Sequence, residues 1–330
     1  MADAGNARTL PQLGFDGVKI DGCGPDRNVT RFAELVDEAS GGRTITIEDC
    51  NDDANWDRGS ADCTEFHDSG CAVSGGGFYR VAGDIFGYWE AIMDRIQQMA
   101  GYLKPDPWHT PLQRPGCWPT PDALEVGCTR QGPLGLNFTE SRSHFGMWVV
   151  TTSPLILGLD LRDKTATDFA WPIITNTEVL AVHAAWPLGP GGETKRRQDY
   201  SPGAMVATDA VFAAGRPQNM TWQVWAKNVT ASSVAVLLLN AGDFVQDVSV
   251  QLSGATGIVP CRPLGMCNDS HLDALCAPTC VTTGTLARTS GIKVTARDLW
   301  NRKALPDVTG TFVAAQLAPH DSAFVLFSRT

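Results

Sequence analysis

Three carboxylates stand where predicted strands begin or end. Asp21 ends a short β-branched run, Asp84 ends the run that starts at Tyr79, and Asp122 opens a further predicted strand. Barrels of alternating strands and helices carry their catalytic groups at strand ends. Retaining glycoside hydrolysis needs two carboxylates about 5–5.5 Å apart, one as nucleophile and one as acid and then base. These positions are therefore compatible with glycosidase chemistry.

Two cations accompany the carboxylates. Lys19 lies two residues before Asp21 and Arg80 lies four residues before Asp84, so each shares a predicted strand face with its carboxylate. A positive neighbour keeps a nucleophilic carboxylate ionised. Solvated loop carboxylates would show the same spacing, so the residues alone leave both interpretations open.

The elements that must position these residues change character along the chain. In the first half, predicted strands alternate with predicted helices, which indicates βα units and a parallel sheet. The predicted strands are 17–21, 44–47, 78–83, 122–126 and 155–159, and the predicted helices are 30–39, 85–102, 140–152 and 176–182.

After the glycine-rich stretch at 189–192, short strands with turn signals and no convincing helix predict an antiparallel β-sandwich. These strands are 222–226, 234–239, 245–252, 294–299 and 324–327. The predicted fold class is α/β followed by all-β, with domains at 1–192 and 193–330.

Composition argues against two kinds of partner. The 330 residues carry a formal net charge of −10 and a sequence pI of about 5.0, which argues against nucleic acid and gives no support for docking on anionic lipid. No apolar run reaches the ~18 residues of a membrane helix. Ten Trp against four Tyr fit core packing better than a sugar-stacking surface, so Trp222 and Trp225 are predicted to be sandwich core.

Cysteines and sequons point to an oxidising compartment. None of the ten cysteines forms a C-x-x-C pair, so disulfides are favoured over a metal site, and no metal or cofactor is expected. Five N-x-S/T sequons favour a secreted or luminal glycoprotein; they begin at Asn28, Asn137, Asn219, Asn228 and Asn268. The first residues lack the regions of a signal peptide, so we expect the front of the protein to lie outside this sequence.

A series of motifs decides between these interpretations. In chain order they are residues 17–23 (GVKIDGC), 79–85 (YRVAGDI), 115–127 (PGCWPTPDALEVG), 140–145 (ESRSHF), 153–161 (SPLILGLDL), 176–182 (NTEVLAV), 297–300 (RDLW) and 319–320 (PH). The series resembles glycoside hydrolase family 27, the α-galactosidase or melibiase family, and its plant-type branch most closely. The likeness is collinear and covers nearly the whole chain.

The resemblance implies a (β/α)8 TIM barrel, here represented by about strands four to eight, followed by a C-terminal β-sandwich. It implies a retaining exo-glycosidase that hydrolyses terminal α-D-galactosyl residues of oligosaccharides, glycoconjugates or polysaccharides. Asp21 would be the nucleophile and Asp84 the general acid/base. The implied substrate contacts are Lys19, Arg80, Asp122, either Glu48 or Asp49, and Trp118 as a wall of the site.

Several alternatives remain open. The substrate could instead be a β-L-arabinopyranoside, because the barrel units that select galactose would lie ahead of the first residue. A truncated inactive paralogue or a sugar-binding protein would fit the same motifs. The resemblance pairs Cys23 with an upstream cysteine and implies a staple from Cys50 to Cys63 or Cys71. His144 is predicted to be a packing residue, and the oligomeric state is left open.

Overall fold

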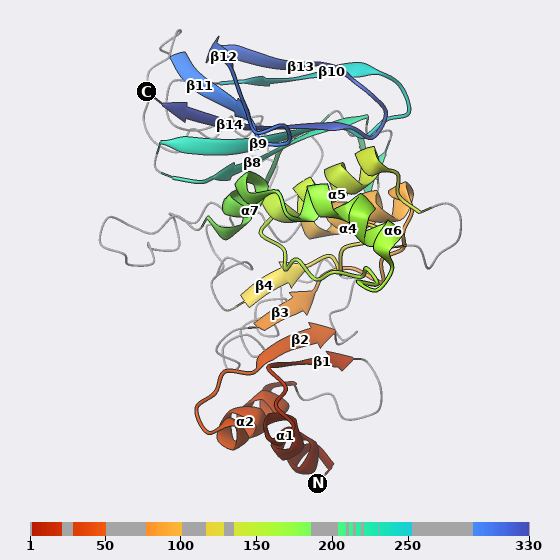
Figure 1. The fold of residues 1–330 in the computed structure, drawn as a ribbon, viewed down its shortest axis with the longest axis vertical. Helices are drawn as coiled ribbons and strands as arrows, with labels where there is room; N and C mark the ends of the chain where they lie inside the picture. Colours follow the sequence, from red (N-terminus) through yellow and green to blue (C-terminus); the bar gives the residue numbers. More distant parts are fainter. Residues whose placement is uncertain are drawn as a thin grey trace.

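The computed structural model describes residues 2–21, 29–50, 77–100, 117–128, 135–185, 204–208, 211–213, 216–218, 221–230, 232–252 and 293–329. Figure 1 shows a parallel sheet with two helices near the N-terminus, a group of helices in the middle and a β-sandwich at the C-terminal end. The predicted order of a βα part followed by an all-β part is confirmed.

The parallel sheet has four strands whose spatial order equals their chain order. They are β1 (Gly17–Asp21), β2 (Thr46–Cys50), β3 (Gly77–Arg80) and β4 (Cys117–Thr120). Helix α2 (Val29–Ser40) follows β1, and α4 (Trp89–Ala100) follows β3. This order is that of consecutive βα units of a barrel wall.

Helix α2 covers one face of this sheet. Ala33 packs on Ile47, with Val18 and Ile20 beside them. Strand side chains alternate between faces, so β1 and β2 turn their aliphatic residues toward α2 and their intervening polar residues the other way. Helix α1 (Ala2–Gln12), which we did not predict, packs on the same helix through Ala7 and Val36.

The strands predicted at 44–47 and 78–83 are Thr46–Cys50 and Gly77–Arg80, and the helix predicted from residue 85 begins at Trp89. Two further predicted strands are misplaced. The strand expected at 122–126 instead lies upstream as β4, and the one expected at 155–159 is reduced to a single parallel bridge between Leu124 and Leu157. Pro121 interrupts the run, and Asp122 has a left-handed φ of 103°, which no strand residue adopts. Asp122 therefore follows the carboxyl end of a strand, as Asp21 ends one.

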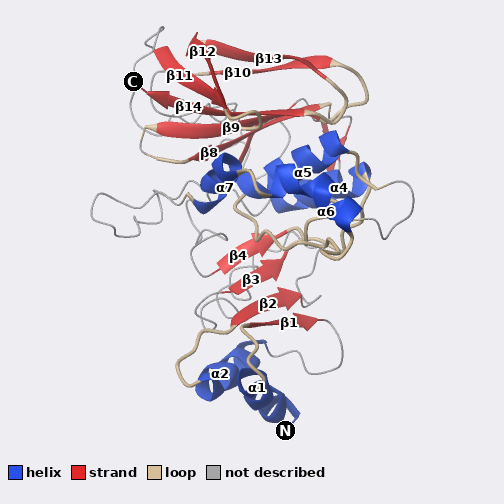
Figure 2. Ribbon diagram, viewed as in Figure 1, coloured by secondary structure: helices blue, strands red, loops and turns tan. Residues whose placement is uncertain are grey.

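Figure 2 shows a group of helices between the parallel sheet and the sandwich, and three of them begin at side-chain caps. They are α5 (Phe138–Val150), α6 (Lys164–Ile174) and α7 (Thr177–Ala184). Asn137 and Glu140 form a capping box at the start of α5, and Asn176 caps α7. Helix α6 was not predicted, and Pro172 stands in its last turn.

The predicted sandwich is confirmed. A six-stranded antiparallel sheet has the order β12-β11-β14-β9-β8-β5, and β10 pairs with β13 across from it. The strands of these two sheets are β5 (Ala204–Thr208), β8 (Trp222–Asn228), β9 (Ser233–Asn240), β10 (Gln246–Gln251), β11 (Lys293–Asp298), β12 (Lys303–Thr309), β13 (Thr311–Leu317) and β14 (Ser322–Arg329). A short hairpin joins β6 (Val211–Ala213) to β7 (Arg216–Gln218). Apolar residues from both sheets, such as Val236 and Val248, fill the space between them.

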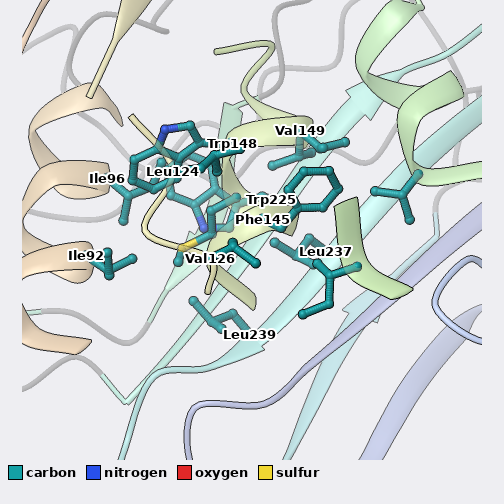
Figure 3. Packing of buried hydrophobic residues seen from close by; sticks show 14 of the residues in the cluster. Ile92, Ile96, Leu124, Val126, Phe145, Trp148, Val149, Trp225, Leu237 and Leu239 are labelled. Atoms are coloured by element: carbon teal, nitrogen blue, oxygen red, sulfur yellow. The ribbon is translucent and has the colours of Figure 1, made fainter. Parts of the chain in front are cut away.

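One hydrophobic core joins the helices to the sandwich. Figure 3 shows Phe145 and Trp148 of α5 beside Trp225 of β8 and Leu237 of β9, all within one cluster. Trp225 is fully buried, as predicted, and Trp222 packs at the edge of the second cluster. The two predicted domains thus share their largest core.

Polar contacts fix the same junction. Arg297 of β11 donates two hydrogen bonds of 2.7 and 2.6 Å to Glu178 of α7. Buried Lys227 of β8 donates to the carbonyls of Val182 and His183 at 2.7 and 2.9 Å, at the end of α7 where carbonyls lack helical partners. Desolvation lowers the pKa of Lys227 to about 7.

Helix α5 approaches the sandwich most closely at Gly146. A Cβ atom added there would lie 2.9 Å from Trp300 Cζ2 and 3.0 Å from Leu237 Cδ1. We expect Gly146→Ala to lower the free energy of unfolding by about 1–3 kcal/mol through overpacking, although alanine is the better helix former. Urea denaturation measures this change.

The matched control is Gly5→Ala in α1, where nothing lies within 4 Å of the added atom. There the same exchange should be neutral or stabilising, by up to about 1 kcal/mol. A stabilised Gly146→Ala protein would contradict the close packing of α5 on β9.

His144 is fully buried in α5, as its predicted packing role requires. Its Nε2 accepts a 3.0 Å hydrogen bond from the Glu125 backbone N–H, and its ring meets Trp148 edge-on. Desolvation lowers the pKa of His144 from 6.5 to about 3. The folded ring therefore stays neutral where the unfolded one takes up a proton.

This difference makes stability depend on pH in one direction. Between pH 6.5 and about 3 the unfolded state binds more protons, so the free energy of unfolding should fall as the pH is lowered through that window. His144→Gln keeps an acceptor but cannot titrate, so its stability should vary less over the same window. Urea midpoints at pH 7, 6, 5 and 4 compare the two proteins, and parallel profiles would contradict the prediction.

Candidate active site

Two rows of side chains cross one face of the parallel sheet. Paired residues of neighbouring parallel strands point to the same face, and residues two apart along a strand share it. The first row holds Lys19, Glu48, Phe78 and Trp118. The second row holds Asp21 beside Cys50, and Arg80 beside Thr120. Five of the predicted site residues therefore share the face opposite α2.

Asp21 lies at the carboxyl end of β1 with Lys19 beside it. The Lys19 Nζ is 3.4 Å from Asp21 Oδ2, and both side chains are about half exposed, at 41% and 53%. Desolvation opposes the charge on Lys19, but interactions with Cys50, Glu48 and Asp21 outweigh it and raise the pKa of Lys19. Lys19 is thus a firmly held cation next to an accessible carboxylate.

The structure separates Glu48 from Asp49. Glu48 stands in register with Lys19, and desolvation raises the pKa of Glu48, with Lys19 and Arg80 opposing the shift. Asp49 is buried and stands in register with Ile20 and Tyr79, on the opposite face. Of the two residues that the sequence left open, Glu48 is the one that lies with the other site residues.

Arg80 connects the carboxylates after β3 and β4. Its side chain is 3% exposed, and its Nη2 lies 2.8 Å from Asp122 Oδ2 and 3.3 Å from Asp84 Oδ1. The same nitrogen donates to the Ala82 carbonyl at 3.1 Å, and Nη1 reaches the Cys50 sulfur at 3.6 Å. One buried guanidinium thus contacts the last residue of β2 and groups that follow β3 and β4.

Asp122 is held by the protein through all its oxygens. Its carboxylate accepts backbone hydrogen bonds from Ile85 at 3.0 Å and Ala123 at 2.7 Å, in addition to the ion pair with Arg80. Its carbonyl accepts from the Trp148 indole at 2.7 Å. The bond to Ile85 links Asp122 to the residue directly after Asp84, so Asp122 positions the segment that carries the predicted acid.

Asp84 combines a fixed backbone with an open side chain. Its carbonyl accepts two hydrogen bonds from the Arg95 guanidinium, at 3.0 and 2.9 Å. Its carboxylate is 82% exposed and contacts Arg80. The arrangement presents a carboxyl group to solvent from an anchored chain.

Cys50 also lies on the face of the sheet that carries the site, although we had not predicted it to be a site residue. It is a free thiol in the structure, and desolvation raises its pKa to about 11, against the opposing influence of Arg80 and Lys19. Its implied partners Cys63 and Cys71, like Cys23, lie outside the described residues. The period-two alternation from Glu48 to Cys50 would have placed it on this face.

Neither a metal site nor a membrane span emerges from the described part of the chain. No group of three or more His, Cys, Asp or Glu side chains there could hold a metal ion. None of its helices is both long and apolar enough to cross a bilayer.

Comparison with known proteins identifies the family to which both parts of the chain are similar. Residues 3–185 match the family described as Alpha galactosidase A, and residues 219–327 match the Alpha galactosidase C-terminal beta sandwich domain. Alpha-galactosidase 2 of Arabidopsis thaliana is 26% identical over 304 residues, and the match covers 86% of this chain and 63% of the relative. The α-galactosidase of Coffea arabica is 27% identical, with 78% of this chain and 58% of the relative covered.

Solved structures share the fold. The α-galactosidase I of Mortierella vinacea superimposes with a TM-score of 0.62 at 20% identity, covering 99% of this chain and 71% of the other. A GH27 β-L-arabinopyranosidase from Geobacillus stearothermophilus gives 0.62 at 21% identity, covering 99% and 61%.

The chain thus spans less than two thirds of its Arabidopsis relative, at 63% of that protein's length. The family match to its first part alone includes more than half of the chain, and the second match follows it over the sandwich. The protein therefore belongs to the α-galactosidase (melibiase) family.

Proposed function

We propose that the protein is a retaining exo-glycosidase that releases terminal α-D-galactosyl residues from oligosaccharides, glycoconjugates or polysaccharides. One observation carries the proposal: Asp21 ends β1, Asp84 follows β3 of the same parallel sheet, and each contacts a cation of the same sheet face. Membership of the family and the α-galactosidases among its relatives support it.

Asp21 and Asp84 have different roles in the proposed reaction. The Asp21 carboxylate attacks the anomeric carbon while the bond to the leaving oxygen breaks, and Asp84 donates a proton to that oxygen. Asp84 then takes a proton from water, whose oxygen attacks the same carbon and releases Asp21. The anchored backbone and exposed carboxylate of Asp84 suit a group that must reach both the substrate and water.

The other site residues bind and position. Lys19 and Glu48 lie in the row next to the nucleophile and would hydrogen-bond sugar hydroxyls, with Trp118 at the far end of that row as a wall. Arg80 and Asp122 would contribute to binding and, through their ion pair, hold the Asp84 segment in place. Asp49, on the other face, has no role in this proposal.

The substrate has one close alternative. A β-L-arabinopyranoside is a galactose-like sugar without the hydroxymethyl group, and a solved structure of similar fold bears that activity in its name. Comparing kcat/KM for the 4-nitrophenyl α-D-galactoside and β-L-arabinopyranoside decides between them. Binding of galactose without turnover of either substrate would instead indicate a sugar-binding protein.

We further propose that the protein is secreted or luminal. Its ten cysteines and five sequons favour an oxidising, glycosylating compartment. Fractionation of the expressing cells tests this location.

Asp21→Asn should lower kcat for the 4-nitrophenyl galactoside by about 10³-fold or more while sparing the fold, because it removes the nucleophile. Asp16→Asn is the matched control: it makes the same exchange just before β1, at a side chain that is 86% exposed. Retention of more than a tenth of the activity in Asp21→Asn would rule out the assigned nucleophile.

Asp84→Ala should discriminate between leaving groups. Hydrolysis of raffinose, whose leaving alkoxide needs a proton, should fall by about 10²- to 10⁴-fold, whereas hydrolysis of the 4-nitrophenyl galactoside should fall far less. Single-turnover release of the leaving group, sucrose or 4-nitrophenol, measures both, because loss of the base in the second step slows galactose release from either substrate. Equal losses would show that Asp84 is not the acid.

A further inference from the structure

The segment after Asp84 alternates between exposed and buried residues. Asp84, Phe86 and Tyr88 are exposed, and the residues between and after them, Ile85, Gly87 and Trp89, are buried. Phe86 is 40% exposed and Tyr88 45% exposed. Both rings therefore stand in solvent within four residues of the exposed Asp84 carboxylate.

Backbone hydrogen bonds and the packing of the buried residues hold this segment in its conformation. The Ile85 N–H donates to Asp122, and the Asp84 carbonyl accepts from Arg95. Trp89 stacks on His320 of the sandwich with ring centroids 4.5 Å apart. At Gly87 an added Cβ would lie 3.2 Å from Glu125 Oε2, so the chain passes close to a buried carboxyl. The aromatic rings therefore cannot turn inward without breaking these contacts.

The two exposed rings form a stacked pair. Their centroids are 6.1 Å apart and their planes are 15° from parallel. Adjacent, nearly parallel rings in solvent offer an apolar face to the C–H groups of a sugar ring, and binding sites characteristically combine such faces with a few polar groups.

We propose that Phe86 and Tyr88 form the platform for the sugar ring attached to the galactosyl residue, the leaving group of the reaction. The inference rests on the proposed role of Asp84. A general acid must lie beside the leaving oxygen, so the ring bonded to that oxygen leaves past the acid. Phe86 and Tyr88 are the aromatic side chains presented two and four residues beyond it. The site thereby favours oligosaccharides over glycosides of small alcohols.

Turnover of two substrates tests the platform. Raffinose places a glucosyl ring in the leaving group, and methyl α-D-galactopyranoside places a methyl group there. Phe86→Ala and Tyr88→Ala should each lower kcat/KM for raffinose by about 3- to 10-fold, the range of one aromatic contact, and leave the methyl glycoside within about twofold. Phe86→Leu, which keeps an apolar side chain but no flat ring, should resemble Phe86→Ala.

Trp171→Ala is the control, because Trp171 is a 55% exposed aromatic residue on α6, outside the segment. It should leave both substrates unchanged. Equal effects of the Phe86 and Tyr88 variants on the two substrates, or no effect on either, would overturn the platform while the proposed function stands.

A binding measurement keeps the test independent of turnover. Saturation-transfer NMR on raffinose with the Asp21→Asn protein should label the glucosyl protons, and adding Phe86→Ala and Tyr88→Ala should abolish that labelling but retain the galactosyl signals. Absence of glucosyl labelling in the parent protein, or its persistence in the triple variant, would overturn the inference. Failure of the unsubstituted protein to hydrolyse any galactoside would overturn the proposed function instead.

Discussion

The ion pair between Arg80 and Asp122 is the interaction on which the site depends. Arg80 is nearly fully buried, and a buried guanidinium without its partner costs several kcal/mol, so the pair must form whenever the sheet does. The partner carboxylate also accepts the Ile85 N–H and thereby sets the direction in which the chain leaves β3. The position of the Asp84 carboxylate follows from these two bonds.

The rest of the molecule supplies the rigid frame for this pair. Asp122 is held through its carbonyl by Trp148, and Trp148 lies in the core that α5 shares with β8 and β9. The stacking of Trp89 on His320 joins the start of α4 to the sandwich directly. The sandwich therefore supports the face of the sheet that carries the site, in addition to forming a core of its own.

Sequence reasoning predicted the strands that carry Asp21 and Arg80 because β-branched and aromatic runs are short and clearly bounded there. It misplaced the strand near Asp122, since Pro121 and a left-handed residue end β4 early, and an apolar run such as 155–159 looks like a strand whether or not a neighbour pairs with it. It missed α6, a helix with Pro172 in its last turn, whose Ala170 and Ile173 pack into the largest core.

The sequence by itself determined the family, the order of a parallel βα part and an antiparallel sandwich, and the residues at strand ends. Local motifs and the periodicity of the apolar residues are sufficient to predict each of these. Only the tertiary structure decided which acidic residue of β2 joins the site, since strand register places Glu48 beside Lys19 and Asp49 on the opposite face. It also decided that Asp122 is held by Arg80 and Ile85, from β3 and the chain after it, and by Trp148 of α5. Such contacts depend on how distant parts of the chain meet, and no local pattern encodes that.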